Sequence, residues 1–347
     1  MIYQPKFYYQ RIPLKVENAT KGQVIRRESV LISDTEQSGF KLHPAFITTE
    51  GEELDYILLP AYEGAVVEDK LCSVAGVQPT TSITIDAAED YANARGNGWH
   101  IMNMKAISAN QMLEMIEFGM LNGQTALEAG VSNLQFSSNI NCSAITGSTA
   151  ALGNTTGAAE STISNNNGTE IVNTTAGTRA ISYRGMENPW GNVWQMVGGI
   201  NILGDGNSNG GAPYICSDFN YTPSEIGDNY EYIGFNLPSI YGWVSAMGYG
   251  KQEYDWVFLP IECASTANSL LPVGDNLWTV ASVAENKIVA VGGTYEYKES
   301  DGAFYYAADR NAAESARHNY GVRLMYIPTK NTTYWNNIAK WEALQGG

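Results

Sequence analysis

The chain has 347 residues, of which 44% are hydrophobic and only 16% are charged, and its 20 basic and 36 acidic side chains give a net charge of −16. A surface this negative repels phosphate backbones, so nucleic acid is excluded as an expected partner. No stretch approaches the roughly 18 apolar residues of a membrane span, and the first ten residues carry no apolar run of the signal-peptide kind. We therefore expect no membrane insertion. The abundance of Gly, Asn, Ser, Thr and Tyr indicates a loop-rich protein with recognition surfaces.

Residues 1–74 are predicted to be rich in β-structure. Three stretches either alternate between apolar and polar residues or are continuously apolar, and Gly and Pro separate them. They predict strands at 7–16, 23–32 and 55–64, with a loop at 41–51. No helical periodicity occurs in this part of the chain. It is treated as a small N-terminal β-rich region that precedes a larger domain.

Two helices are predicted next. The first covers 87–95, with Asp86 as its N-cap and Gly96 at its end, and a strand follows at 96–102. Ser108 opens the second, in which the methionines and leucines recur at helical spacing. This pattern predicts an amphipathic helix whose methionines fill the core.

Residues 137–178 are small, polar and of low complexity, and we interpret them as an excursion inside one domain of residues 75–330. Strands are predicted to dominate after residue 180. A short closing helix at 336–344 lies in a C-terminal tail, 331–347. The late strands are predicted at 255–261, 277–283, 287–297, 302–308 and 321–328.

The stretch YRGMENPWGNVWQM, residues 183–196, fits neither helical nor strand periodicity. It follows a polar loop, and a Gly-Gly strand (292–293) and Gly-Val-Arg-Leu (321–324) come after it. This order resembles the formylglycine-generating-enzyme (sulfatase-modifying-factor) superfamily over about residues 75–328. The resemblance implies an α+β, C-type-lectin-like fold, rich in loops.

One branch of that superfamily is more similar still. It contains bacteriophage structural proteins and ligand-binding proteins diversified by reverse-transcriptase cassettes. The similarity rests on Tyr-Arg-Gly-Met-Glu-Asn-Pro-Trp-Gly-Asn at 183–192, on Glu-Phe-Gly with Asn122 and Gln124 at 117–124, and on His-Pro-Ala-Phe at 43–46.

In a fold with little regular structure, aromatic anchors must hold the loops. Trp190 and Trp194 bury large apolar areas while their N–H groups find carbonyl partners. Glu187, if buried, needs a partner, and Arg184 is the nearest candidate in the sequence. We interpret these four residues, together with Asn192, as scaffold.

Catalytic members of the superfamily use a cysteine pair near the C-terminal part or a histidine-rich metal site. Here His43, His100 and His318 are scattered, and no cysteine follows Cys263. The four cysteines are expected to be reduced thiols. Motifs of the GxSxG and HExxH kinds are absent, and the carboxylates at 50–53 and 89–90 are interpreted as solvated faces. The sequence predicts a protein without enzymatic activity or cofactor.

Calcium is the one metal for which the sequence contains a partial binding motif. Asp205–Gly210 matches the first half of a calcium loop, but Cys216 occupies the twelfth position, where a bidentate Glu is needed. Family members often carry a calcium-binding Glu after the second Trp of the motif, where this chain has Gln195. A polar turn is the preferred interpretation, and calcium stays the alternative.

In the diversified branch the variable ligand-binding surface lies between the Gly-Gly strand and the closing Gly-x-Arg-Leu strand. The matching window is 292–324. Its apolar frame is set by core packing, whereas a mixture of Tyr, Arg, Asn and His suits a hydrogen-bonding, stacking surface. An ordinary solvated loop is the alternative. The candidate ligand-binding residues are Tyr295, Tyr297, Tyr306, Arg310, Asn311, Glu314, Arg317, His318 and Asn319.

The resemblance implies a bacteriophage virion protein, a tail-fibre, head-fibre or receptor-binding component made in the host cytoplasm. Its N-terminal region would mount or oligomerise it, with a homotrimer expected by analogy, among other virion proteins. Its C-type-lectin-like loops would bind a host-surface glycan or protein. A decoration protein without a receptor, a bacterial surface lectin and a degenerate oxidase are the alternatives.

Overall fold

The computed structural model describes residues 1–134, 139–160, 163–164, 170–171, 176–206, 210–268, 271–279 and 284–328. The fold is mixed α+β, mostly β-sheet with few helices, and loop-rich, as the sequence predicted at that level. The predicted tail and its closing helix lie outside the described residues, as do 137–138, 161–162, 165–169 and 172–175 of the polar excursion. None of the helices in the described ranges has the length and apolar character to cross a lipid bilayer.

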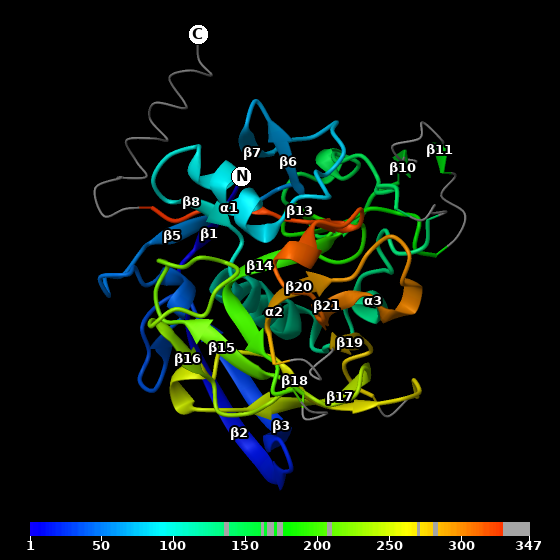
Figure 1. Ribbon diagram of the computed structural model, residues 1–347. Coiled ribbons are helices and arrows are strands. Elements are labelled where there is room, and N and C mark those ends of the chain that lie inside the picture. The colour runs from blue at the N-terminus through cyan, green and yellow to red at the C-terminus, as the bar shows by residue number, and fades with distance from the viewer. Residues whose placement is uncertain are drawn as a thin grey trace.

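The largest layer in the described part of the chain is a sheet of 12 strands (Figure 1). It combines strands that are distant in the sequence, since β3 (Gly22–Ser33) pairs with β17 (Gly242–Tyr249) through Ile25 and Met247. Strand β18 (Pro260–Ala264) pairs with β17, and β22 (Tyr320–Gly321) pairs with β14. The main path runs β16 (Tyr230–Tyr232), β15 (Ala212–Cys216), β14 (Trp194–Leu203), β20 (Asn286–Gly292), β21 (Gly302–Ala308), β19 (Asn276–Thr279), β17 (Gly242–Tyr249), β3 (Gly22–Ser33), β2 (Tyr8–Ala19) and β4 (Lys41–Leu42).

A second sheet ties the N-terminal region to the end of the described chain. Its order is β1 (Ile2–Pro5), β5 (Tyr56–Leu59), β23 (Leu324–Tyr326) and β8 (Trp99–Ile101). Leu58 of β5 pairs with Tyr326 of β23. Residues 1–74 thus contribute to both large sheets and are not a separately folded unit. The smaller sheets are β6 (Gly64–Val67) with β7 (Lys70–Ser73), β9 (Gly157–Ala158) with β12 (Ile181–Tyr183) and β13 (Met186–Glu187), and β10 (Ile163–Ser164) with β11 (Glu170–Ile171).

Strand β14 separates two hydrophobic clusters. Trp194 and Met196 face the smaller cluster, which includes the buried side of helix α1 (Ile85–Asn93). Val197 and Ile200 face the larger cluster, which includes helix α2 (Met104–Phe118). Val197 reaches the larger cluster by ordinary strand alternation, and Ile200 faces the same side because the register shifts between Val197 and Asn201, where Gly198–Gly199 interrupt the alternation. Both faces of β14 are therefore covered.

The helix starts differ from the predicted ones because of capping. The side chain of Thr84 accepts a hydrogen bond from the Ala87 N–H, so α1 begins at Ile85 and Asp86 lies in its first turn. Asn103 caps α2 in the same way by accepting from the Ala106 N–H. The helix therefore begins at Met104, four residues before the predicted start at Ser108. A third short helix, α3, covers Gly123–Ala126.

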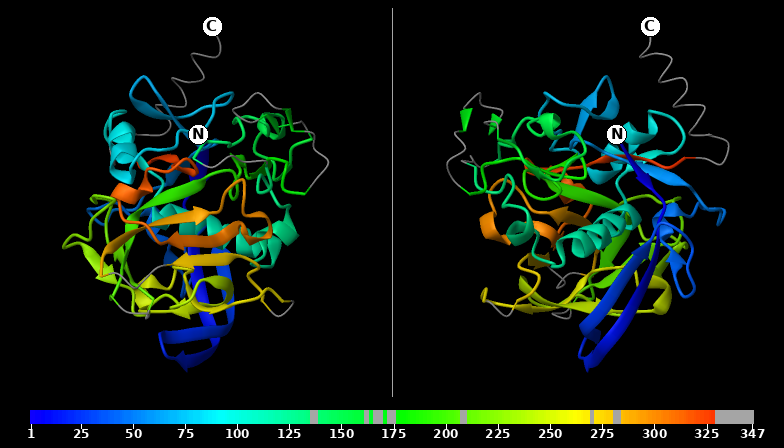
Figure 2. Two further views of the ribbon diagram at one scale, coloured as in Figure 1. Left: turned by 45° about the vertical axis from the view of Figure 1, so that its right-hand side comes forward. Right: turned by 180° about the vertical axis from the view of Figure 1, so that it is seen from behind.

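The expected amphipathic character of α2 is wrong, because its first eleven residues are all buried. The helix runs through the middle of the molecule against the central sheet (Figure 2). Its polar side chains bond to backbone carbonyls instead of water. Ser108 Oγ donates to Trp256 O, and Gln111 Nε2 donates to Ala303 O at 2.7 Å. Polar residues here are core residues with satisfied hydrogen bonds.

The predicted strand at 255–261 is wrong in its first part. A 3₁₀ helix (Gln252–Tyr254) precedes it, and β18 begins only at Pro260. Trp256, Val257 and Phe258 are nevertheless buried, because this irregular segment passes through the core. Arg11 Nη1 donates to the carbonyls of Asp255 (2.8 Å) and Val257 (3.1 Å), which replaces the missing strand pairing.

Glu114 on α2 provides a test of this burial. Burial raises the pKa of its carboxyl from 4.5 to about 8, with a smaller contribution from Glu117. The unfolded chain releases this proton near its ordinary pKa, whereas the folded chain keeps it up to about pH 8. The free energy of unfolding should therefore fall as pH rises from about 4.5 to about 8. Glu114→Gln should remove a fall on the order of 4 kcal/mol.

Urea unfolding of both proteins across this pH range measures the effect. Glu225→Gln, at an exposed position, is the matched control and should leave the pH dependence unchanged. If the Glu114→Gln protein shows the same pH dependence as the wild type, the burial of Glu114 does not control it.

Candidate functional site

The stretch 183–196 forms β12, β13 and the start of β14 near the centre of the fold. Trp190 is fully buried, and its Nε1 donates to Glu128 O at 3.1 Å. Gly191 has a φ of +78°, and a Cβ there would lie 2.6 Å from Val131 O, so only glycine fits. The indole and the close backbone contact hold this loop against its neighbours.

The expected pairing of Glu187 with Arg184 is wrong. The Glu187 carboxylate accepts hydrogen bonds from the N–H groups of Gly147 and Thr149, both at 2.7 Å, and from Thr149 Oγ1 at 2.8 Å. Arg184 lies instead beside Glu117, with 3.6 Å between Nε and Oε1. Backbone donors from a loop distant in sequence satisfy the buried carboxylate, and no local pattern could reveal them.

A buried arginine connects this motif to the C-terminal strands. Arg323 Nη2 donates to the carbonyls of Glu187 (2.7 Å) and Asn188 (2.5 Å) and lies 4.0 Å from Glu63 Oε1. Glu63 also accepts from Asn192 Nδ2 at 2.8 Å. Burial raises the pKa of Glu63 to about 7, although Arg323 opposes this shift.

Pairing of distant strands creates a small cavity of about 90 Å³, called the aromatic pocket below. β22 pairs in parallel with β14, which places Tyr320 beside Trp194. β21 pairs in parallel with β19, which places Ala307 beside Trp278. The aromatic residues that line the pocket are Trp194, Trp278, Tyr297, Tyr305 and Tyr320.

The aromatic walls support one another. The Trp194 and Tyr305 rings are 4.5 Å apart in an edge-to-face arrangement, and Tyr297 and Tyr320 lie 6.0 and 6.1 Å from Trp194. Such pairs are favourable beyond the area they bury. The pocket therefore has its shape before any ligand enters.

Polar groups complete the pocket. The Asp309 carboxyl is nearly buried and lies 2.9 Å from Arg310 Nε. Burial raises its pKa, while Arg310, a hydrogen bond from Trp278 and Arg317 lower it. Asn319 is 5% exposed, and its Nδ2 donates to Glu296 Oε1 at 2.8 Å. Its Oδ1 has no hydrogen-bond partner among the described residues.

The structure brings four of the nine candidate ligand-binding residues to this pocket. They are Tyr297, Arg310, Arg317 and Asn319. Tyr297 and Arg317 are exposed, and Arg310 is half-buried. No hydrogen bond or ion pair connects the Arg317 guanidinium to another side chain in the described ranges. The pocket thus presents free donors beside free acceptors.

Asn311, Glu314 and His318 lie outside the pocket. The Glu314 N–H donates to Asn311 Oδ1 at 3.0 Å, and the Asn311 N–H donates to Glu314 Oε2 at 3.3 Å. These bonds enclose the short 3₁₀ helix Ala313–Ser315. His318 is half-buried. The three side chains shape the loop that carries Arg317.

Three of the nine candidates, Tyr295, Tyr306 and Asn319, are buried and do not form part of an exposed surface. Tyr306 OH donates to Phe258 O at 2.8 Å, and Tyr295 OH donates to Ile140 O at 3.2 Å. Each tyrosine is a core residue whose hydroxyl reaches a carbonyl. Only Asn319 of the three also reaches the pocket.

Sequence reasoning missed most of the pocket walls. Trp194 was assigned to the scaffold alone, and Trp278, Tyr305, Asp309 and Tyr320 were not assigned to a site. Trp278 was detectable, because it alternates with buried neighbours in β19 and must face outward.

Trp278 is 43% exposed and Tyr241 is 60% exposed, with 4.6 Å between their ring centroids and 36° between their planes. We call this pair the aromatic ledge. Because Trp278 also lines the aromatic pocket, pocket and ledge are continuous.

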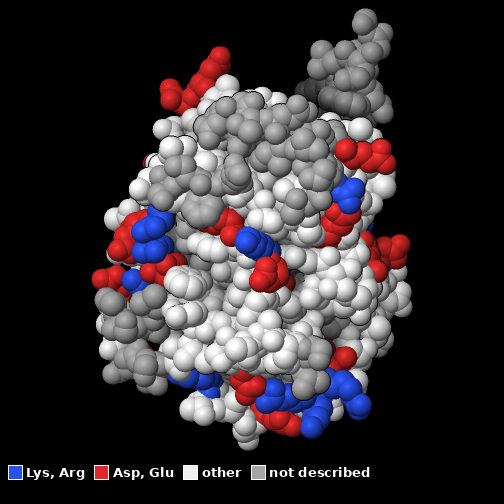
Figure 3. Space-filling model, turned by 90° about the vertical axis from the view of Figure 1, so that its right-hand side faces the viewer, with Lys and Arg blue, Asp and Glu red and all other residues white. Residues whose placement is uncertain are grey.

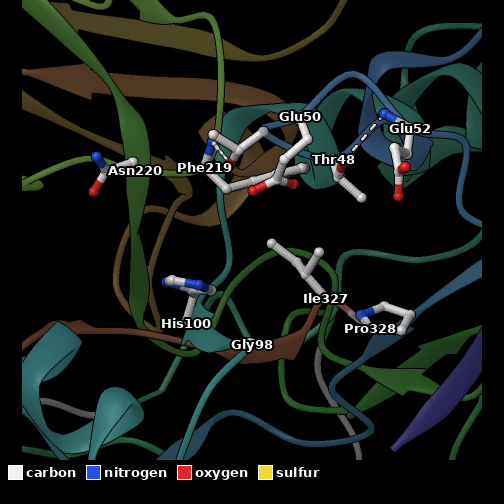
Figure 4. A pocket seen from close by; sticks show the side chains of 10 residues that line it. Thr48, Glu50, Glu52, Gly98, His100, Phe219, Asn220, Ile327 and Pro328 are labelled. Carbon is white, nitrogen blue, oxygen red and sulfur yellow. Dashed lines mark hydrogen bonds between the residues drawn. The ribbon is translucent and has the colours of Figure 1, made fainter. Parts of the chain in front are cut away.

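A second, larger cavity of about 450 Å³ lies between the loop at 48–52 and the strands β8 and β23 (Figure 4). We call it the acidic cavity, because Glu50 and Glu52 project from one wall and no Lys or Arg is among the described residues that line it. Sequence reasoning treated these carboxylates as a solvated face. The spacing of these carboxylates in the sequence could not show that they lie opposite a separate strand.

None of the four cysteines forms a disulfide bond, as predicted. Within the described ranges, no group of three or more His, Cys, Asp or Glu side chains is arranged to hold a metal ion. Most of the predicted calcium loop after Gly206 lies outside the described residues. Gln195 Nε2 donates to the carbonyls of Asn188 (3.3 Å) and Pro189 (3.4 Å), which gives this side chain a structural role.

The face of the molecule in Figure 3 has broad uncharged areas, interrupted by a few charged side chains. This matches the low charged fraction of the sequence. No protein-family model matches the chain, and no curated protein sequence matches it. The site is therefore interpreted from its own geometry.

A substitution at Tyr306 tests whether this residue acts in folding or in ligand binding. Tyr306→Phe removes the hydroxyl that bonds to Phe258 O and Gln111, so both buried groups lose a partner. We expect a loss of about 1–3 kcal/mol in the free energy of unfolding, measured by urea titration, without a change in ligand affinity. Tyr326→Phe is the control, because its hydroxyl makes no hydrogen bond to the described residues, and it should change stability by less than about 0.5 kcal/mol. Equal losses in the two variants would contradict the role of the Tyr306 hydroxyl.

Proposed function

We propose that the chain is a non-enzymatic bacteriophage virion protein that binds a host-surface glycan at the aromatic pocket and ledge. The observation that carries this proposal is the continuity of an exposed Trp278–Tyr241 pair with a preformed pocket holding free donors and acceptors. The resemblance of residues 183–192 and 321–324 to phage proteins with a C-type-lectin-like fold supports it. The buried Trp190 and Trp194 are consistent with that fold.

A saccharide suits these surfaces chemically. The apolar faces of sugar rings stack on exposed aromatic side chains, and their hydroxyl groups both donate and accept hydrogen bonds. A cavity of about 90 Å³ holds only one ring substituent, since small-molecule sites usually measure about 300–1,000 Å³. The ring itself would rest on the ledge, with Arg317 and Asn319 reaching its hydroxyl groups.

The pocket is suited to binding and not to glycosidic cleavage. Glycosidases place two carboxyl groups on either side of the bond that breaks. Among the described residues that line the aromatic pocket, Asp309 is the single carboxylic acid, and Arg310 is paired with it.

The N-terminal hairpin β2–β3 supports the mounting role. It exposes Leu14 (54%) and Leu31 (42%), and its turn lies at the lower end of the molecule in Figure 1. Exposed leucines on a long hairpin suit contact with other virion proteins or with further copies of the chain. In a homotrimer, three weak glycan sites would act together and raise avidity.

Adsorption of phage particles to host cells tests the function. Trp278→Ala and Arg317→Ala should each weaken adsorption, and the double variant should reduce it at least about tenfold, because ring stacking and a hydrogen bond to a charged group are both lost. Particle assembly and melting temperature should be unchanged, since both side chains are exposed. Lys70→Ala, an exposed basic residue on β7 outside both the pocket and the hairpin, is the matched control.

Normal adsorption of the double variant would favour the decoration-protein alternative. A glycan array with the purified protein identifies the ligand and separates a glycan receptor from a protein receptor. The genes that neighbour the coding sequence distinguish a virion protein from a bacterial lectin.

A further inference from the structure

The acidic cavity is a second binding site, separate from the glycan pocket. Its volume of about 450 Å³ lies in the range of small-molecule sites. Its walls come from four separate parts of the chain: the loop at 48–52, the loop before β16 that carries Phe219, the start of β8 and the residues just after β23. None of these walls contributes to the aromatic pocket.

Backbone bonds hold the acidic wall in place. The Thr48 N–H donates to Glu52 O at 2.8 Å, and the Glu52 N–H donates to Thr48 Oγ1 at 3.1 Å. Thr49 Oγ1 accepts from the Phe219 N–H at 3.4 Å, which connects this wall to the next. In Figure 4 the side chain of Glu50 projects from this wall toward Ile327 and His100. No ion pair joins the Glu50 carboxylate to a cation in the described part of the chain.

The facing wall combines an oriented histidine with apolar surface. His100 Nδ1 lies 2.7 Å from Glu89 Oε1, and the Ile101 N–H donates to Glu89 Oε2 at 2.9 Å. In the tautomer with the proton on Nδ1, which Glu89 would accept, Nε2 is an acceptor. Ile327 and Pro328 supply the apolar part of this wall.

The cavity is therefore negative and rich in acceptors on one side and apolar on the other. The basic side chain of Lys105 packs on the Phe219 ring, and its Nζ donates to Ser217 O at 2.8 Å. That cation is occupied by the carbonyl and the aromatic ring and is not among the residues that line the cavity. The net charge of −16 also attracts cations to this surface.

We propose that the acidic cavity binds a primary alkylammonium group. The ammonium head would lie between Glu50, Glu52 and His100 Nε2, and its methylene stem would pack on Phe219, Ile327 and Pro328. An ammonium has three donors and no acceptor, which matches a wall of carboxylates. Two kinds of ligand carry such a group: a free aliphatic amine and the lysine side chain of a protein.

Isothermal titration of the full chain with 1,5-diaminopentane tests the site. The diamine should bind, and 1,5-pentanediol, with the same stem and no charge, should not. Glu50→Gln should weaken diamine binding about tenfold, and the Glu50→Gln/Glu52→Gln double variant about a hundredfold. Glu36→Gln removes an exposed carboxylate outside the cavity and should leave the affinity within about twofold of wild type.

Absence of diamine binding, equal binding of the diol, or equal loss in the Glu36→Gln control would each overturn the proposal. A second titration compares the diamine with a blocked lysine, N-acetyl-lysine methylamide. Tighter binding of the blocked lysine supports the site and assigns a protein source. Tighter binding of the diamine supports the site and assigns a free amine. Host adsorption does not depend on these variants, so the glycan proposal is tested separately.

Discussion

The buried guanidinium of Arg323 is the interaction on which the rest of the structure depends. An uncompensated charge in the interior costs several kcal/mol, so the fold must bring partners to it. Two of these are the carbonyls of Glu187 and Asn188 in the tryptophan motif, and the third is the Glu63 carboxyl of the N-terminal region. One side chain thus joins three segments that are distant in sequence.

The geometry of the aromatic pocket follows from this connection. Arg323 lies between β22 and β23, so its contacts with the motif fix the chain that carries Tyr320. Tyr320 in turn pairs with Trp194, the residue at which the motif becomes β14. The pocket walls are therefore set by core interactions and not by a mobile loop. A preformed pocket loses little conformational entropy when a ligand binds.

The sequence predicted the parts of this structure that depend on local patterns. Strand alternation located β2 and β3, and the Pro-Trp-Gly-Asn segment indicated a buried irregular scaffold. Partners across long sequence separations were not predictable. Glu187 is satisfied by the backbone of residues 147–149, and Gln111 of α2 by a carbonyl almost two hundred residues away. Local composition shows that such groups are polar, but tertiary structure decides which are buried.

The same limit explains the binding residues. Tyr297 and Tyr306 look alike in the sequence, yet Tyr306 lies in β21 with its ring in the larger cluster, whereas Tyr297 lies in the loop after β20 and is exposed. Successive residues of β21 face opposite sides, so Tyr305 reaches the pocket while Tyr306 fills the core. The window 292–324 contributes residues to the aromatic pocket, but the alternation of side chains along β21 decides which of its tyrosines line that pocket. The acidic cavity was beyond any such pattern, because its walls meet only through β8, β23 and the loop at 48–52. Its carboxylates gain an apolar wall opposite them only in the folded chain, and that juxtaposition turns a solvated charged face into a site selective for an ammonium group with an apolar stem.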